Sequence, residues 1–212
     1  MVLAQIEHLK RSMIYFRRAI VKKSEMSSFN INNLVRDAAL VCCPYRKDFM
    51  PAGHEKAMDI QITEKLDDEM MHMTGDQEAM YLGLYHMIDN AVVATSYRGG
   101  KVNIYTKFFP KLNKMQLTVS DTGEGIDKMG VMKSALAAEV ITMKKLVEMN
   151  EDKKEYNNRA FSLIFKPLVG IFNGKDVTHK GIGLTLAKET IDFHKGKIDI
   201  HSKEGKGTTF QL

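Results

Sequence analysis

Three short stretches of the sequence combine polar side chains and glycines at spacings that suit ligand binding. In the first, His86 and Asn90 lie four residues apart, so both side chains project from one face of a helix. An Asn amide oxygen can bind a hard cation such as Mg²⁺, which takes few protein oxygens and fills its other positions with phosphates and water. Taken alone, the pair is equally typical of a structural Asn that makes hydrogen bonds within the fold.

The second and third stretches are rich in glycine. Asp121-Thr122-Gly123-Glu124-Gly125 places a carboxylate at the end of a predicted strand, with glycines two and four residues later. Such glycines let the backbone pass close to a flat ligand while Asp121 accepts a hydrogen bond from an amino group. Gly181-Ile182-Gly183-Leu184 precedes a predicted helix, whose unpaired N–H groups and dipole favour a phosphate. Each of these two motifs alone is weak evidence for a ligand site. The stretch that begins at Asp121 also fits a plain Asp-Gly turn.

The hydrophobic pattern predicts a scaffold that can position these stretches. Apolar residues at helical spacing predict a helix that Asp76 caps and that runs to about Ser96, and another over 183–193. Alternating patterns predict strands near 59–63, 71–74, 101–107, 115–120, 197–202 and 208–212. The two strands on either side of Pro110–Asn113, at 101–107 and 115–120, are expected to form an antiparallel hairpin. Helices on one face of a mixed, mostly antiparallel sheet describe a two-layer α+β sandwich.

Other helices are predicted nearer the N-terminus and in the middle of the chain. A short strand at Phe29-Asn30-Ile31 leads into a helix to about Val41, with Asn32 or Asn33 as its N-cap, and a further helix runs from Ala135 to about Met149. Residues 2–24 carry apolar side chains at alternating three- and four-residue spacing. This seam favours one helix of a coiled coil or dimeric bundle over a helix packed on its own domain.

Composition restricts the class of protein. The 212 residues, 44% of them hydrophobic, are enough for one large globular domain. The formal net charge of +5 suits phosphate-bearing partners but is too diffuse to indicate nucleic acid. The sequence holds no apolar run of membrane-spanning length and no signal peptide, so we expect a cytoplasmic chain. Adjacent Cys42 and Cys43 suit neither an intrachain disulfide nor a metal motif.

The order of the motifs is more specific than any one of them. From about Phe29 to Leu212 the chain resembles the catalytic and ATP-binding domain of sensor histidine kinases, within the GHKL group of ATPases. The stretches that carry the resemblance are similar to the N box (Asp76 to Ala91), the G1 box (Asp121 to Ile126), the F box (Ile164 to Leu168), the G2 box (Lys180 to Ala187) and the last two strands (His194 to Phe210).

The resemblance implies ATP and Mg²⁺ as cofactors. It implies that Asn90 coordinates the metal, that Asp121 binds the adenine amino group, and that Gly123 and Gly125 line the base. Gly181 and Gly183 would hold the phosphates beneath a mobile lid at about 169–180. The remaining residues assigned to the nucleotide are Ile126, Lys175, His179, Lys180, Leu184 and Thr208. Those of the lid, Lys175, His179 and Lys180, either neutralise phosphate charge or are solvated loop charges.

The chain departs from the family pattern at three positions. His86 replaces a usual Asn, Val93 stands where a Lys or Arg often follows, and Thr185 replaces a usual Gly. We take His86 as a candidate catalytic residue that orients the γ-phosphate or activates water, and the alternative is a plain helix-face residue. Thr185 is expected to stiffen the hinge of the lid without removing the phosphate site.

The resemblance also divides the chain. Residues 1–26 resemble the second helix of the dimerisation and phosphoacceptor hairpin, and 27–212 the ATP-binding domain. Within the ATP-binding domain, the segment 127–163 is about thirty residues longer than the short connection that the family has at this place. This extra length indicates an insertion, which is either a regulatory or docking element or a passive part of the surface. The first hairpin helix is absent, and His8, followed by Leu9, lacks the acceptor pattern. The acceptor histidine is therefore expected outside this chain.

The sequence thus predicts a two-component histidine kinase domain. It would transfer the γ-phosphoryl of ATP to a histidine on a dimerisation helix, for relay to an aspartate of a response regulator. The resemblance implies a full-length homodimer that is cytoplasmic or membrane-anchored. Two alternatives stay open: a GHKL-fold ATPase or serine kinase, and a catalytically silent docking module.

Overall fold

The computed structural model describes residues 25–42, 60–68, 72–96, 99–150, 153–167, 169 and 182–212. The helix predicted over 2–24, and with it nearly all of the 1–26 segment, lies outside the described residues. So does the lid at about 169–180, apart from Val169.

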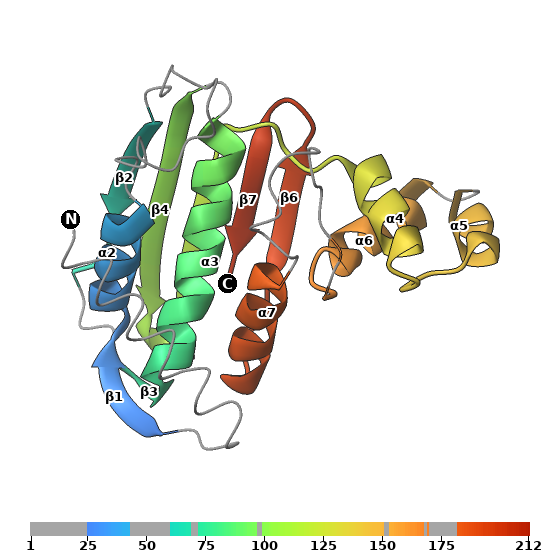
Figure 1. The fold of residues 1–212 in the computed structure, drawn as a ribbon. Coiled ribbons are helices and arrows are strands. Elements are labelled where there is room, and N and C mark those ends of the chain that lie inside the picture. Colours follow the sequence, from blue (N-terminus) through green and yellow to red (C-terminus); the bar gives the residue numbers. More distant parts are fainter. Residues whose placement is uncertain are drawn as a thin grey trace.

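Within the described part of the chain, five strands form the main sheet, in the order β2-β4-β5-β7-β6 (Figure 1). Their bounds are β2 (Ile60–Lys65), β4 (Gly100–Phe109), β5 (Lys114–Asp121), β6 (Asp199–Lys203) and β7 (Gly207–Gln211). β2 and β4 run parallel, and the other neighbours are antiparallel. The predicted mixed, mostly antiparallel sheet is confirmed. A separate antiparallel pair joins β1 (Met26–Asn30) to β3 (His72–Asp76).

Helices α2 (Ile31–Cys42), α3 (Gln77–Ser96) and α7 (Gly183–Phe193) cover one face of this sheet (Figure 1). The alternation of each strand decides which side chains meet them: Val102 and Ile104 of β4 and Val119 of β5 point inward and are at most 1% exposed. They pack with α3 residues such as Leu84 and Ile88 in one hydrophobic cluster. The α+β two-layer fold class is therefore confirmed.

The N-caps explain where two of these helices begin. Asp76 Oδ1 accepts a hydrogen bond from Ala79 N at 3.0 Å, so the predicted cap of α3 is confirmed. The predicted cap of α2 was wrong. Asn30 Oδ1 accepts from Asn32 N at 2.8 Å, while the Asn32 amide lies buried and bonds to Asp67 O and Thr106 Oγ1. Asn32 is needed in that buried network, so the last strand residue caps the helix.

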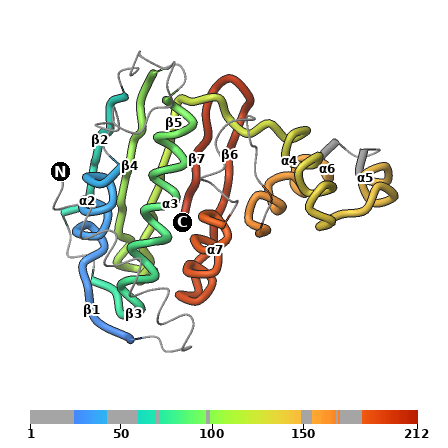
Figure 2. The backbone as a smooth tube through the Cα atoms, in the orientation of Figure 1, coloured from blue at the N-terminus to red at the C-terminus, as the bar shows by residue number. Residues whose placement is uncertain are grey.

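Residues after the β5 loop form α4 (Lys128–Ala137), α5 (Met143–Asn150) and α6 (Lys153–Leu163). The single helix expected over 135–149 was wrong. Asp127 Oδ1 caps α4 by accepting from Gly130 N at 2.9 Å, so the helix begins at Lys128. Glu139, with φ of +56°, then turns the chain before α5. These helices lie to one side of the sandwich, next to α7 and β6 (Figure 2).

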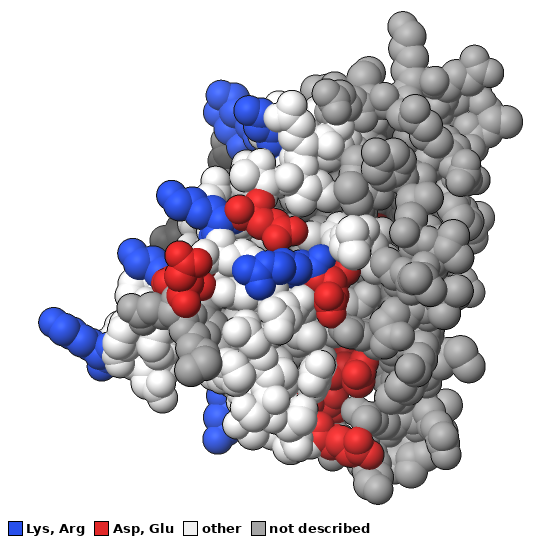
Figure 3. Space-filling model, turned by 90° about the vertical axis from the view of Figure 1, so that its left-hand side faces the viewer, with Lys and Arg blue, Asp and Glu red and all other residues white. Residues whose placement is uncertain are grey.

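A second hydrophobic cluster joins α4 and α6 to the sandwich. It contains Met132 and Leu163 from these helices together with Met87 of α3, Ala187 of α7 and Phe210 of β7. Elsewhere the surface is mixed in charge: on the side of the molecule that Figure 3 shows, basic and acidic side chains of the described residues are interspersed. None of the helices in the described ranges is long and apolar enough to span a bilayer.

Candidate functional site

Asp121 lies at the end of β5 with only 6% of its surface exposed. Its Oδ1 accepts two backbone hydrogen bonds, from Gly123 N at 2.8 Å and from Thr208 N at 3.2 Å. Its Oδ2 makes no hydrogen bond to any described residue and so can accept one from a ligand. Burial raises the pKa of the Asp121 carboxyl because desolvation disfavours its charged form, and the two N–H donors lower it again in part.

The loop after Asp121 rests against the last turns of α3. A Cβ added at Gly123 would lie 2.3 Å from Ala94 O and 2.9 Å from Thr95 N, so only glycine fits there. Glu124 N also donates to Ala94 O at 3.3 Å. The helix that carries His86 and Asn90 therefore supports the loop directly.

The other side of this loop rests on the turn between β6 and β7. Gly125 has φ of +72°, and its Cβ would lie 2.4 Å from Lys203 O. Gly205 N donates to Glu124 O at 2.6 Å, and Ile126 N donates to Ser202 Oγ at 2.9 Å. The loop is thus held between α3 and the β6–β7 turn, with its backbone fixed before any ligand binds.

His86 and Asn90 lie half-buried on α3, one turn apart. The Asn90 amide makes no hydrogen bond to any residue that the structure describes, so its oxygen is available to a ligand. His86 packs edge-on against the ring of Tyr85, with centroids 5.3 Å apart. The alternative is that Asn90 is a structural residue that makes hydrogen bonds within the fold. No hydrogen bond among the described residues supports this alternative.

The first turn of α7 lies directly on His86. A Cβ added at Gly183 would be 2.9 Å from His86 Nδ1 and 3.1 Å from Cγ. The cap position of α7 is Ile182, whose side chain makes no cap hydrogen bond. The dipole of the helix favours an anion at this end. The geometry brings this helix N-terminus against the helix that carries Asn90.

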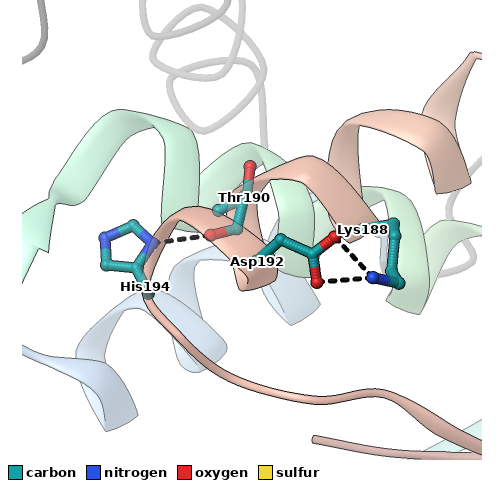
Figure 4. A network of polar contacts seen from close by, with 4 residues as sticks. All are labelled: Lys188, Thr190, Asp192 and His194. Atoms are coloured by element: carbon teal, nitrogen blue, oxygen red, sulfur yellow. Dashed lines mark hydrogen bonds and ion pairs between the residues drawn. The ribbon is translucent and has the colours of Figure 1, made fainter.

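The opposite end of α7 is fixed to the start of α3 through His194. Asp76 N donates to His194 Nε2 at 3.1 Å. His194 Nδ1 contacts Thr190 O at 2.7 Å (Figure 4). Because Nε2 accepts, the proton of the neutral ring must be on Nδ1. The ring fills the space beside Gly75, where a Cβ would lie 2.1 Å from Nε2. The two helices of the site are thus tied together away from the ligand.

The chain matches a protein family model over residues 75–212, and the family is described as histidine kinase-, DNA gyrase B- and HSP90-like ATPases. This chain belongs to that ATPase family. The matched range contains every site residue described above. Membership of an ATPase family makes a nucleotide the ligand class of the site.

Curated relatives of this ATPase domain include signalling kinases. Chemotaxis protein CheA of Bacillus subtilis is 26% identical over 168 residues, which cover 76% of this chain and 22% of that protein. CheA of Listeria monocytogenes is 29% identical over 171 residues, covering 78% and 25%. Adaptive-response sensory kinase SasA of a Synechococcus strain is 24% identical over 191 residues, covering 90% and 41%. The chain spans about a quarter of the length of these CheA relatives.

Solved structures share the fold of the ATPase domain. The catalytic domain of histidine kinase ThkA aligns with a TM-score of 0.53 and 21% identity, covering 88% of this chain and 95% of that one. Full-length ShkA, solved in complex with AMPPNP, aligns with a TM-score of 0.54 and 18% identity, covering 89% and 30%.

The structure places most of the predicted site residues of the ATPase domain in two connected groups. Asp121, Gly123, Gly125, Ile126 and Thr208 are joined through the loop after β5. His86, Asn90, Gly183 and Leu184 lie along α3 and the first turn of α7. Lys175, His179, Lys180 and Gly181 lie outside the described residues, so their assignment to the phosphates stays a prediction.

Two residues that support the ATPase site escaped the sequence reasoning. Ser202 Oγ accepts a hydrogen bond from Ile126 N. Gly207, with φ of +99°, lies where a Cβ would be 2.0 Å from Asp121 O. The available signal was a serine at an inward position of β6, two residues after the apolar Ile200. Thr185 is buried in the first turn of α7, so its side chain is part of the packed helix.

Proposed function

We propose that this chain is the ATP-binding catalytic domain of a two-component histidine kinase. It binds Mg²⁺-ATP and transfers the γ-phosphoryl group to a histidine on a dimerisation helix outside this chain. The observation that carries the proposal is the Asp121 carboxylate, which has one oxygen held by two backbone N–H groups and the other open. An acceptor oriented in this way suits the amino group of adenine.

The base end of the site follows from the loop after Asp121. Asp121 Oδ2 accepts from the adenine amino group, and Gly123 and Gly125 keep side chains away from the base. Ile126 and Thr208 hold the two sides of the loop in place. This arrangement is fixed in advance, so little ordering cost is added when the nucleotide binds.

The phosphate end lies where α3 meets α7. Asn90 would hold Mg²⁺ through its amide oxygen, and the N-terminus of α7 would bind phosphate oxygens. The described residues include no group of three or more His, Cys, Asp or Glu that could hold a metal ion. This donor set fits Mg²⁺, which takes few protein ligands and relies on phosphate oxygens and water. The bound ion would neutralise charge on the transferred phosphoryl group.

His86 lies at this phosphate end because Gly183 packs on its ring. We assign it the role of orienting the γ-phosphoryl group toward the acceptor. Phosphoryl transfer depends mainly on positioning and charge stabilisation, so an imidazole fixed between two helices suits the task. Lys175, His179 and Lys180 would add positive charge from the lid.

The partners follow from the reaction. The names of the relatives, chemotaxis and sensory kinases, support a phosphoacceptor domain and a response regulator as successive acceptors. We propose that the full-length protein is a homodimer that acts in the cytoplasm, where ATP is available. In this scheme residues 1–26 supply part of the dimerisation helix pair, and 127–163 form an insertion in the ATP-binding domain.

Calorimetric titration with ATP, with and without Mg²⁺, tests the proposal. We expect Mg²⁺-dependent binding that Asp121→Asn abolishes and that Asp199→Asn, a change to an exposed carboxylate on β6, leaves unchanged. Full-length protein incubated with radiolabelled ATP should then carry acid-labile phosphate on histidine. No binding by the wild type would leave a docking module, and free phosphate without phosphohistidine would indicate a hydrolase.

A further inference from the structure

Ser202, on the inward side of β6, uses the whole hydrogen-bonding capacity of its hydroxyl group. Its Oγ donates to Gly207 O at 3.2 Å and accepts from Ile126 N at 2.9 Å. Thr208 Oγ1 lies 3.0 Å away. A serine hydroxyl has one donor and two acceptor sites, so with the proton given to Gly207 O, the remaining bond must come from the Thr208 hydroxyl.

Each of the three residues that bond to Ser202 is connected to Asp121, by a hydrogen bond, by a close backbone contact or through the loop after β5. Thr208 N donates to Asp121 Oδ1 at 3.2 Å. Gly207 lies so close to the Asp121 backbone carbonyl that a Cβ would be 2.0 Å from its oxygen. Ile126 ends the loop that Asp121 begins. One hydroxyl group therefore joins both backbone segments that determine where the Asp121 carboxylate points.

A second pair of hydroxyl side chains on the same sheet offers a comparison with Ser202 and Thr208. Ser202 and Thr208 are cross-strand neighbours on β6 and β7. The second pair, Ser120 and Thr209 at 2.9 Å, occupies outward strand positions, and its two hydroxyl groups bond to each other. The two pairs are chemically similar, but among the described residues only the Ser202–Thr208 pair contacts the loop after β5.

We propose that Ser202 is a positioning residue for base recognition, acting through Thr208 and Ile126 on the Asp121 carboxylate. The inference rests on the proposed function, because it takes Asp121 as the acceptor for the adenine amino group. Removal of the hydroxyl releases Thr208 and Ile126 and lets the carboxylate rotate. The affinity for a nucleotide with a 6-amino group then falls more than the affinity for one without it.

The test compares ATP with purine riboside triphosphate, which lacks the 6-amino group, by calorimetry on the full chain. We expect the wild type to prefer ATP. Ser202→Ala should weaken ATP binding by about three- to tenfold, as for the loss of hydrogen bonds, and weaken the analogue less. Ser202→Thr, which keeps the hydroxyl, should restore the preference. Thr209→Val removes the outward hydroxyl of the matched pair and should leave both affinities unchanged.

The outcomes separate this inference from the proposed function. Equal loss for both nucleotides would show that Ser202 only stabilises the fold, and two unchanged affinities would show that it has no role at the base. Either result overturns the inference alone. A wild type that binds neither nucleotide overturns the proposed function and this role with it. If Ser202→Ala does not fold, Ser202→Cys gives the same comparison, since a thiol is a weak donor and acceptor.

Discussion

The backbone of Gly183 lies against the imidazole ring of His86, so closely that a Cβ at position 183 would be 2.9 Å from Nδ1. This contact joins the first turn of α7 to the middle of α3, where the phosphates of a nucleotide are proposed to bind. The two helices can lie this close together because the residue at position 183 has no Cβ.

Gly183→Ala should lower the free energy of unfolding by about 1–3 kcal/mol, because the methyl group overlaps the His86 ring. His86→Ala in the same chain opens the space and should recover most of that loss. Urea denaturation of the single and double variants measures both. Gly83→Ala is the matched control on the same helix pair, since its Cβ would meet Ala187 at an ordinary 3.5 Å. Additive losses in the double variant would contradict the contact.

Asp121→Asn should preserve the fold while it removes adenine recognition. Burial raises the pKa of Asp121, so the folded protein holds this proton more tightly than the unfolded chain. The stabilisation is therefore present below the ordinary carboxyl pKa and is lost as pH rises through the folded value. Asn does not ionise, so the melting temperature of the variant should gain on the wild type as the pH rises above the ordinary Asp pKa of about 4.

Thermal melts of wild type and Asp121→Asn across that pH range measure this difference, with Asp199→Asn as an exposed control. A variant that loses ground to the wild type toward neutral pH would mean that hydrogen bonding from Gly123 and Thr208 outweighs desolvation. The same melts show whether lost ATP binding reflects unfolding.

Asn90→Ala should remove the Mg²⁺-dependent part of ATP binding, because its amide oxygen is the proposed protein ligand for the ion. We expect ATP affinity with Mg²⁺ to fall by about tenfold or more, toward the affinity measured with a chelator. Calorimetry in both conditions gives the ratio. Asn103→Ala, on an outward position of β4, is the control for the residue type. A variant that keeps the full Mg²⁺ effect would place the ion elsewhere.

His194→Ala should destabilise the protein far more than loss of the neighbouring ion pair that Figure 4 shows. The imidazole joins Asp76 N to Thr190 O. Its loss takes the side-chain acceptor from Asp76 N and leaves Thr190 O with only its bond from His194 N, at a cost of about 1–3 kcal/mol. The pair between Lys188 and Asp192 is exposed, so Asp192→Asn should cost about 0.5 kcal/mol or less. Urea denaturation compares them, and similar losses would contradict the link between α3 and α7.

The elements that the sequence predicted well are those with local signals. The helix from Asp76 to Ser96 has a capping carboxylate and helical apolar spacing, and the hairpin around Pro110 has alternation on both sides. The N-cap of α2 escaped because the choice among Asn30, Asn32 and Asn33 depends on a buried network with Asp67 and Thr106. That network exists only once distant segments have packed.

The same reasoning explains the site. The close backbone contacts of Gly123 and Gly125 could be predicted because strain and close approach demand particular residue types in one short stretch. The assignment of Asp121 to the adenine stays a prediction. Ser202 could not be predicted, because its role depends on a cross-strand partner and on a loop 76 residues away in sequence. The assignments of Asn90 and His86 to metal and phosphate stay predictions.

Met87 lies on the same helix as His86 and Asn90, yet it packs with Met132 and Leu163 in the cluster that joins α4 and α6 to the sandwich. Half-buried Ile198 and Leu212 pack against both clusters. Helices α4 and α6 and the sandwich should therefore unfold in one cooperative transition, since opening α4 and α6 would expose Met87. Substitutions selected in α4 and α6 must also satisfy α3, so the two parts are expected to evolve together.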